Sequence, residues 1–501
     1  MNGFLTYILT PHGKAFESTK KSFPVSLRFV TRRLNLKTAL NLYKIRLVLH
    51  PYFDANMELR LDTGFRQILK MALPISLAML VPQINFITNN IFLGGLGERE
   101  LAAAGITGVF YLIFAVVGNG LNNGLQSLIA RRAGQNLPKE IGRLFYNGVW
   151  VALSIAAIGI LITYLFAPII LRATIHDVQT AEQVIQFLLI RIWGLPFLYL
   201  YVMRNALLVG TNQTKFLVWG TLSEALVNIA LDYGFIYGHF GFPRIGFNGA
   251  AYASIIAEAT GLMVIYGVIR IKGIHKAFSF FEQTKIDLSI TKLILVQSAP
   301  LIVQFAISIM SWEYFYILIE HHGARALAIS NTMRNIFGLF GIFCWAFAST
   351  TNTMVSNIIG QGRTEEVMPL VKRIVKLSLS ISAFTFVVLN IAPGFFLSFY
   401  GQGEEFIAEA IPVVRIVSLA LMMMSFGTIW LNAVTGTGNS KVNLMIEFIT
   451  IIIYSAYVYI VLEYWNLPIT WGWGSEWVYW ISMFSMAFFY MQSGKWKGKK
   501  I

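Results

Sequence analysis

Runs of about 20 apolar residues recur along almost the whole chain, separated by short polar connections. The runs are continuously apolar rather than alternating, which favours helices over strands. Helices also satisfy their own backbone hydrogen bonds in lipid. The pattern therefore predicts an all-α integral membrane protein with twelve transmembrane helices. These are expected near residues 68–93, 105–129, 145–170, 183–208, 216–238, 247–270, 293–319, 333–357, 373–398, 409–433, 442–463 and 476–492.

Self-similarity divides the spans into two halves. Pro74 and Pro300 lie 226 residues apart, as do Gly97 and Gly323. "AGQ" at 133–135 returns as "IGQ" at 359–361, and "GTNQTK" at 210–215 returns as "GTGNSK", in the same register. Each half holds six spans, an even number, so both halves enter the membrane from the same side. We expect two six-helix bundles related by a pseudo-two-fold axis along the membrane normal.

This repeat sets the expected domain organisation. An N-terminal lobe covers residues 57–270, and a C-terminal lobe covers 293–501. A polar, basic linker, 271–292, joins them on the cytoplasmic side. Alternating access by rocking of the two lobes follows naturally from this plan, although parallel repeats occur in more than one transporter fold.

Composition supports the membrane class and narrows the function. Only 13% of the 501 residues are charged, against roughly a quarter in soluble proteins. Cys344 is the single cysteine, which excludes an intrachain disulfide and a cysteine-based metal site. The chain has neither GxxxxGK[ST] nor HExxH. We find no convergent nucleophile or metal constellation, so we expect no enzyme and no cofactor.

Lysine and arginine set the orientation. One set of connections carries Arg131, Arg132, Lys139, Arg143, Lys215, Arg270, Lys272, Lys276, Lys285, Arg363, Lys372, Arg373, Lys441, Lys495, Lys497, Lys499 and Lys500. The opposite set carries Arg99, Arg172, Arg244 and Arg325. The richer side is expected in the cytoplasm, which places both termini there. The expected location is the cytoplasmic membrane, as a multi-pass protein.

Residues 1–56 form a basic N-terminal extension. They hold nine Lys or Arg and two Asp or Glu, nearly half of the net charge of +15. Such an arm can bind nucleic acid or anionic lipid. We favour a poorly ordered or non-native extension instead, because Met57 begins "MELRLDTGF" just before the first span. We therefore expect no nucleic-acid partner.

Polar residues inside the apolar runs are the candidate site. Glu224, Asn228 and Asp232 follow one another four residues apart on one face of the fifth span. The first span offers Asn85 and Asn89, and the sixth offers Ser254 and Glu258. Ionisable groups at membrane depth often mark ion or proton pathways.

Two kinds of chemistry fit these residues. Carboxylate and amide oxygens suit a hard cation, so Asp232 and Asn228 are candidate ligands for Na⁺. A carboxylate removed from water can instead take up and release a proton. The coupling ion is therefore H⁺ or Na⁺. The alternative for the asparagines is helix packing, because interhelical polar bonds stabilise membrane bundles by about 0.6 kcal/mol on average.

The C-terminal lobe offers weaker candidates. Glu313 in "IMSWEYFYIL" is a possible second proton site. Gln126 and Asn352 are partners in the repeat, and with Asn85 and Met424 they are candidate lining residues of a substrate cavity.

From about Gln67 onward the sequence resembles the MATE (multidrug and toxic compound extrusion) transporters. The similar motifs are "LP" at 73–74, "GLG…LAAAGI", "ARRAGQ" at 130–135, "GTNQTK", "NIALDYGFIYGHFGFPRIGFNGAAYAS" at 228–254 and "SGKW". The resemblance implies a cation-coupled antiporter that exports small amphipathic or cationic compounds. We expect a monomer whose partners are its substrate and membrane lipid.

The resemblance also marks site residues. Asn228 and Asp232 match the family's N-lobe cation site, and Ser254 matches a hydroxyl placed nearby. Asn89 stands where one branch of the family commonly has an acidic residue, so this site has one negative charge fewer. The alternative function is a flippase for lipid-linked oligosaccharide or another lipid from a sister family, for which Arg191 and Arg204 are the available cations.

Overall fold

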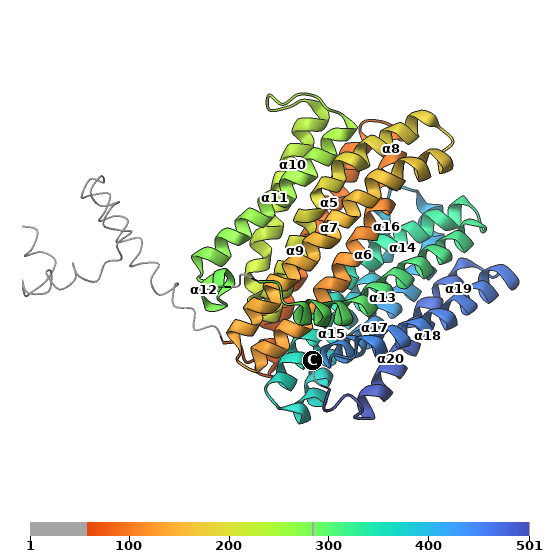
Figure 1. Ribbon diagram of the computed structural model, residues 1–501. Coiled ribbons are helices and arrows are strands. Elements are labelled where there is room, and N and C mark those ends of the chain that lie inside the picture. Colours follow the sequence, from red (N-terminus) through yellow and green to blue (C-terminus); the bar gives the residue numbers. More distant parts are fainter. Residues whose placement is uncertain (1–57, 283–284, 500–501) are drawn as a thin grey trace, which may run out of the picture. The chain divides into compact units, whose positions relative to one another are not determined.

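The computed structural model describes residues 58–282 and 285–499, so the predicted extension at 1–56 lies outside the described residues. Contacts group residues 58–270 and 274–501 into one compact unit. In the described residues all regular secondary structure is helical (Figure 1). Ten of the described helices are long and apolar enough to cross a membrane. We assign α10 and α20, of 21 and 18 residues, as the remaining two of the predicted twelve spans.

The spans of the first half are α5 (Phe65–Gly94), α6 (Glu98–Gly134), α7 (Pro138–Thr174), α8 with α9 (Val178–Arg191 and Leu195–Gly210), α10 (Leu217–Tyr237) and α11 (Phe247–Ile271). Those of the second half are α13 (Leu288–Glu320), α14 (Ala324–Gly360), α15 (Val367–Ile391), α17 (Glu404–Gly436), α18 (Ser440–Val458) and α20 (Ser475–Gln492). Short helices α12 (Ile274–Ala277), α16 (Pro393–Ser398) and α19 (Ile469–Trp473) lie between spans.

Two predicted spans differ from the observed helices. The ninth was predicted to reach residue 398, but α15 ends at Ile391 and α16 begins at Pro393. Proline disfavours a helical residue before it and has no N–H to donate, so the helix breaks there. The fourth span is interrupted at Ile192–Gly194 by a turn of 3₁₀ helix that joins α8 to α9.

Local sequence explains where several helices start and stop. The carboxylate of Asp287 accepts hydrogen bonds from the N–H groups of Ser289 and Ile290 and caps α13. Gly238 ends α10 in the left-handed region at φ 81°, which glycine adopts without steric cost. Gly97 and Gly323 precede α6 and α14 with φ of 148° and 96°, so the repeat preserves this conformation too.

The predicted internal repeat is visible in the helix bounds. The bounds of α14 are those of α6 displaced by 226 residues, from 98 to 324 and from 134 to 360. The ends of α9 and α17, Gly210 and Gly436, show the same displacement. The two halves therefore share one arrangement of six spans each.

Helices α6 and α14 meet along a seam between the two lobes. Glycines make the close approach possible: a Cβ on Gly134 would lie 2.0 Å from the carbonyl oxygen of Asn357, and one on Gly360 would lie 2.3 Å from that of Arg131. On the α13 side of α6, a Cβ on Gly124 would lie 2.2 Å from Ser298 Oγ. Small residues let helix backbones pack closely in membranes.

Polar side chains join the lobes along this seam. Gln126 Nε2 donates to Thr353 Oγ1 at 2.8 Å, and Asn352 Nδ2 donates to the Asn123 carbonyl at 3.2 Å. Arg131 is 4% exposed and donates through Nη2 to the carbonyls of Gly436 and Thr437 at the end of α17. All of these contacts lie in the second halves of α6, α14 and α17.

Residues 58–63 form a segment before α5 that binds the opposite lobe. Asn357 of α14 donates to the Leu59 carbonyl at 2.8 Å and accepts from the Leu61 N–H at 3.0 Å. Gln361 donates to the Leu61 carbonyl at 2.9 Å. Leu61 is 2% exposed. This strap therefore adds a covalently tethered contact between the lobes.

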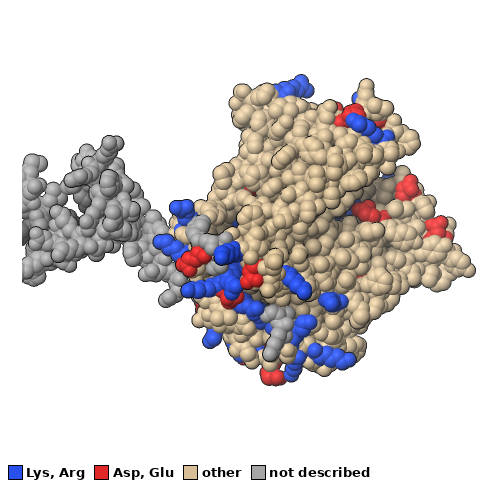
Figure 2. All heavy atoms as spheres, viewed as in Figure 1, with Lys and Arg blue, Asp and Glu red and all other residues tan. Residues whose placement is uncertain are grey.

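We call the end of the helices that holds the strap, the seam and the connections 134–138, 210–217, 360–367 and 436–440 the basic end. Lysines and arginines gather there (Figure 2). Among the described residues, the hydrogen bonds between the lobes lie on this side. At the opposite end the surface is recessed between the lobes (Figure 2). The structure is thus sealed at the basic end and open at the other.

Candidate functional site

The first and fifth spans, α5 and α10, pack against each other, and their hydrogen bonds show that they run in the same direction. Gln67 on α5 bonds to Asn212, just before α10, and the Tyr237 hydroxyl at the far end of α10 donates to the Phe92 carbonyl at 2.7 Å. Both pairs are 145 residues apart. A constant separation along the whole length is the register of two parallel helices.

This register brings the predicted asparagines and aspartate together. Asn85 Nδ2 donates to Asn228 Oδ1 at 2.7 Å. One helical turn further on, Asn89 of α5 and Asp232 of α10 lie at the same level. Asn228 and Asp232 are 2% and 1% exposed. Asn85 and Asn89 are half-buried. The register thus places these four predicted residues on facing sides of α5 and α10, and we call them the N-lobe site.

Most polar atoms of the N-lobe site have no partner within the described part of the chain. Both carboxylate oxygens of Asp232, the Oδ1 atoms of Asn85 and Asn89, and Nδ2 of Asn228 are buried without a hydrogen bond. An ionised carboxylate without a partner in such surroundings is strongly destabilising. A proton, or a cation held by these oxygens, removes that cost.

The donor set fits a hard monovalent cation or a proton. It offers carboxylate and amide oxygens without sulfur or imidazole, which selects against soft metals. Among the described residues, no group of three or more His, Cys, Asp or Glu is arranged to hold a metal ion. With asparagine at position 89, the cluster contains a single acid.

The other candidates on the fifth and sixth spans lie elsewhere. Glu258 forms a buried ion pair with Arg191 across α11 and α8, with Oε2 at 3.1 Å from Nη1. The Arg191 guanidinium also stacks 4.1 Å from the Tyr111 ring centroid. Glu224 is half-buried against Gly261. Within the described residues, Ser254 makes no hydrogen bond to the N-lobe site.

The candidates for a second site and a cavity are also dispersed. Glu313 is exposed on α13. Gln126 and Asn352 are fully buried in the seam, where they join the lobes. Met424 is buried between α17 and α14, 3.5 Å from the position of a Cβ on Gly341.

A buried carboxylate in the second lobe, that of Glu447, was not predicted. Glu447 of α18 is 0% exposed and accepts hydrogen bonds from the hydroxyls of Ser308 and Tyr479 and, at 3.4 Å, from Gln304 Nε2. The signal was present in "NLMIEFITIII", an acid inside an apolar run like Asp232. Unlike Asp232, Glu447 has its acceptors occupied by neighbouring side chains.

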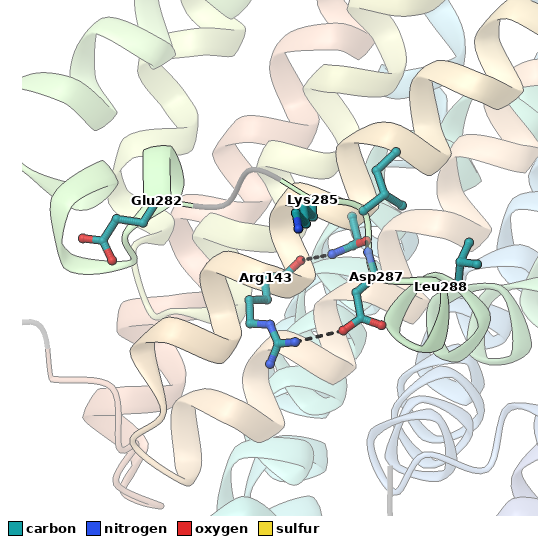
Figure 3. Close-up of a pocket in the computed structure, with 7 residues that line it drawn as sticks. Arg143, Glu282, Lys285, Asp287 and Leu288 are labelled. Carbon is teal, nitrogen blue, oxygen red and sulfur yellow. Dashed lines mark hydrogen bonds and ion pairs between the residues drawn. The ribbon is translucent and has the colours of Figure 1, made fainter.

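A separate pocket of about 500 Å³ lies at the basic end, beside the start of α13. Arg143 of α7 donates to Asp287 at 2.9 Å, and the Asp287 N–H donates to Asn147 (Figure 3). The ion pair is partly exposed. These contacts attach the segment between the lobes to α7, and the pocket is remote from the N-lobe site.

The sequence matches a known family twice. The MatE family model matches residues 74–234 and again residues 300–460. The second match begins 226 residues after the first, the same displacement as the helix bounds.

Two relatives are described as probable multidrug resistance protein NorM. The protein from Synechocystis sp. is 28% identical over 210 residues, 41% of this chain and 44% of that protein. The protein from Rhizobium meliloti is 30% identical over 209 residues, 42% of this chain and 44% of that protein. The matched stretch thus spans less than half the length of each relative.

Solved structures match over nearly the whole fold. A MOP superfamily transporter from Pyrococcus furiosus superposes with a TM-score of 0.80 at 18% identity, covering 88% of this chain and 98% of that one. An outward-facing multidrug resistance MATE family transporter gives 0.81 at 17% identity, covering 89% and 99%. At these identities the likeness establishes the fold. Because the family model matches well over half of the chain, in two copies set by its own repeat, this protein belongs to the MatE family.

Proposed function

We propose that this protein is a cation-coupled antiporter that exports small amphipathic or cationic molecules across the cytoplasmic membrane. The observation that carries the proposal is Asp232, a buried carboxylate with both oxygens unpaired beside three asparagines. Binding of H⁺ or Na⁺ there neutralises the acid, and release into the cytoplasm restores it. The related NorM proteins named above support multidrug efflux as the activity.

The arrangement of the lobes supports alternating access. Under the lysine and arginine rule the basic end is cytoplasmic, together with both termini. The seam and the strap then close the cytoplasmic side, while the recess opens outward. Asp232 lies five residues from the outer end of α10, about 8 Å along the helix axis. This short distance supports exchange of the bound ion with the outside in this state.

One elementary charge that crosses 100 mV of membrane potential is worth about 2.3 kcal/mol, which drives export of a neutral molecule. Exchange of one H⁺ or Na⁺ for a monovalent cation moves no net charge, so the concentration gradient of the coupling ion then supplies the energy. Because the N-lobe site contains a single acid, Asp232, we expect this lobe to bind one coupling ion per transport cycle.

The flippase alternative has less support. Cations suited to a pyrophosphate head group would have to face the recess, but Arg191 is paired with Glu258 inside the N-terminal lobe. Arg204 is 2% exposed and lines a cavity between α7, α9 and α11. Neither arginine belongs to the surfaces that meet along the seam.

The test is transport in proteoliposomes with a Na⁺ gradient and a pH gradient applied separately. Asp232→Asn should abolish exchange driven by either gradient while leaving the protein folded and monodisperse. Asp177→Asn is the matched control, because Asp177 is an exposed helix cap and asparagine caps equally well. Full gradient-driven exchange by Asp232→Asn would overturn the coupling role.

A further inference from the structure

A second buried polar side chain with unpaired atoms, Arg204, lies in the N-terminal lobe, away from the N-lobe site. Arg204 of α9 is 2% exposed, and its Nε and Nη1 atoms are buried without a hydrogen bond. Its Nη2 donates to Asn205 Oδ1 at 2.9 Å, and the guanidinium stacks on the Tyr201 ring at 3.9 Å. Two of the three guanidinium nitrogens of this buried cation therefore lack an acceptor.

The backbone makes room for this guanidinium. A Cβ on Gly220 of α10 would lie 2.5 Å from Arg204 Nη1. Glu224, one turn further along α10, is close enough to interact electrostatically with Arg204. Among the described residues, however, Arg204 has no ion pair within 4.0 Å. Glu224 therefore does not accept a hydrogen bond from Nε or Nη1 of Arg204.

Arg204 lines a cavity of about 430 Å³ between α7, α9 and α11. The other lining residues are apolar or aromatic: Phe145, Tyr146, Val149, Leu200, Leu262, Met263, Ile265, Tyr266, Ile269 and Phe280. Met263 and Tyr266 are 65% and 45% exposed, so the cavity opens sideways, where a transmembrane helix meets lipid. An apolar chamber with a buried cation in its wall suits a molecule with an acyl chain and an anionic head.

The depth of Arg204 fits a lipid head group. Arg204 lies six residues before the end of α9 at the basic end, about 9 Å along the axis. The polar layer of a bilayer leaflet is of comparable thickness, about 5–8 Å beyond the hydrocarbon. Basic residues crowd this end of the molecule (Figure 2). They favour anionic lipid at the cytoplasmic surface.

We propose that this cavity is a binding site for an anionic phospholipid of the cytoplasmic leaflet. The phosphate pairs with the positive charge of the Arg204 guanidinium in the cavity wall, and one acyl chain fills the apolar groove past Met263 and Tyr266. The lipid enters sideways from the bilayer. This site is separate from ion coupling and does not depend on the direction of transport.

Native mass spectrometry of the delipidated full chain tests the proposal. Phosphatidylglycerol and phosphatidylcholine with identical acyl chains are titrated separately, and free oleate is titrated as the anionic amphipath that is not a phospholipid. The wild type should bind phosphatidylglycerol most tightly. Arg204→Gln should weaken it by about tenfold or more, because a buried charge partner is lost.

Two further variants complete the test. Met263→Trp keeps the charge but fills the groove, and should also weaken phosphatidylglycerol binding. Lys372→Gln removes one exposed positive charge at the basic end of the other lobe and should leave it unchanged. Equal binding of the two phospholipids by the wild type, unchanged binding in both cavity variants, an equal loss in Lys372→Gln, or tighter binding of oleate would each overturn the proposal.

Discussion

Closure of the basic end depends on glycine at position 134. In Gly134→Ala the added Cβ would lie 2.0 Å from the Asn357 carbonyl oxygen and 2.9 Å from its carbon. These are backbone atoms, so no side-chain rotation relieves the clash. The ends of α6 and α14 must move apart by more than 1 Å to restore ordinary contact. The variant therefore acts on the sealed state and leaves each lobe intact.

The free-energy cost of Gly134→Ala can be judged from how tightly α6 and α14 pack. Overpacking of a tight interface costs about 1–3 kcal/mol. Alanine favours the helix over glycine by roughly 0.5–1 kcal/mol. This gain is the same in the sealed and the open state, so it does not offset the clash, which destabilises the sealed state alone. A cost of about 1–3 kcal/mol lowers the ratio of the state sealed at the basic end to the state open there about 5- to 150-fold.

Spin-label distances across the open end can measure this shift. Cysteines at Val178 and Glu405, which are exposed at the ends of α8 and α17 opposite the basic end, report the separation of the lobes. The native Cys344 is buried and does not compete for label. Gly134→Ala should shift the distribution toward shorter distances.

Gly108→Ala is the matched control on the same helix. No atom lies within 4 Å of a Cβ at Gly108, so this variant should keep the wild-type distances. If Gly134→Ala also keeps them, or if both variants change alike, the seam of α6 and α14 does not determine which end is closed.

Three further predictions concern single side chains. Asn89→Asp adds a second carboxylate at the level of Asp232 and should tighten Na⁺ binding by about tenfold or more in isothermal titration, because ligand charge tunes cation affinity; unchanged affinity would separate the two residues. Glu447→Leu removes the acceptor of the half-buried Tyr479 hydroxyl and should cost about 1–3 kcal/mol; an unaltered melting temperature in detergent would contradict this. The hydrogen bond to Glu463 raises the pKa of His321. Its stabilisation is thus present below the ordinary histidine pKa and lost as pH rises through the raised value, and Glu463→Gln should lower the pKa of His321 in an NMR titration.

The sequence predicted the spans, the repeat and the N-lobe site because each leaves a local or periodic signal. Asn228 and Asp232 share a helix face by spacing alone, and an acid in an apolar run is conspicuous. The break at Pro393 was also readable, since proline restricts the residue before it. The seam could be suspected only from the spacing of small residues, which also occurs where helices pack within one lobe.

The sequence did not indicate which buried charged side chains pair with one another. Nothing in the spacing of Arg191 and Glu258, which are 67 residues apart, indicates that they form an ion pair and that Glu258 is thereby separated from Asp232. The same holds for Glu447, whose donors come from α13 and α20. These pairings are set by how helices rotate against one another, which hydrophobic periodicity constrains loosely when nearly every face is apolar.

The chemical character of the seam bears on how fast the lobes can separate. Its polar contacts come from serine, threonine and amide side chains together with Arg131, and glycines bring the backbones close. When the faces part, water can replace each hydrogen bond that breaks. Hydrogen bonds of this kind hold the lobes together while water is excluded and break readily once water enters. A gate that must reopen in every transport cycle requires this behaviour.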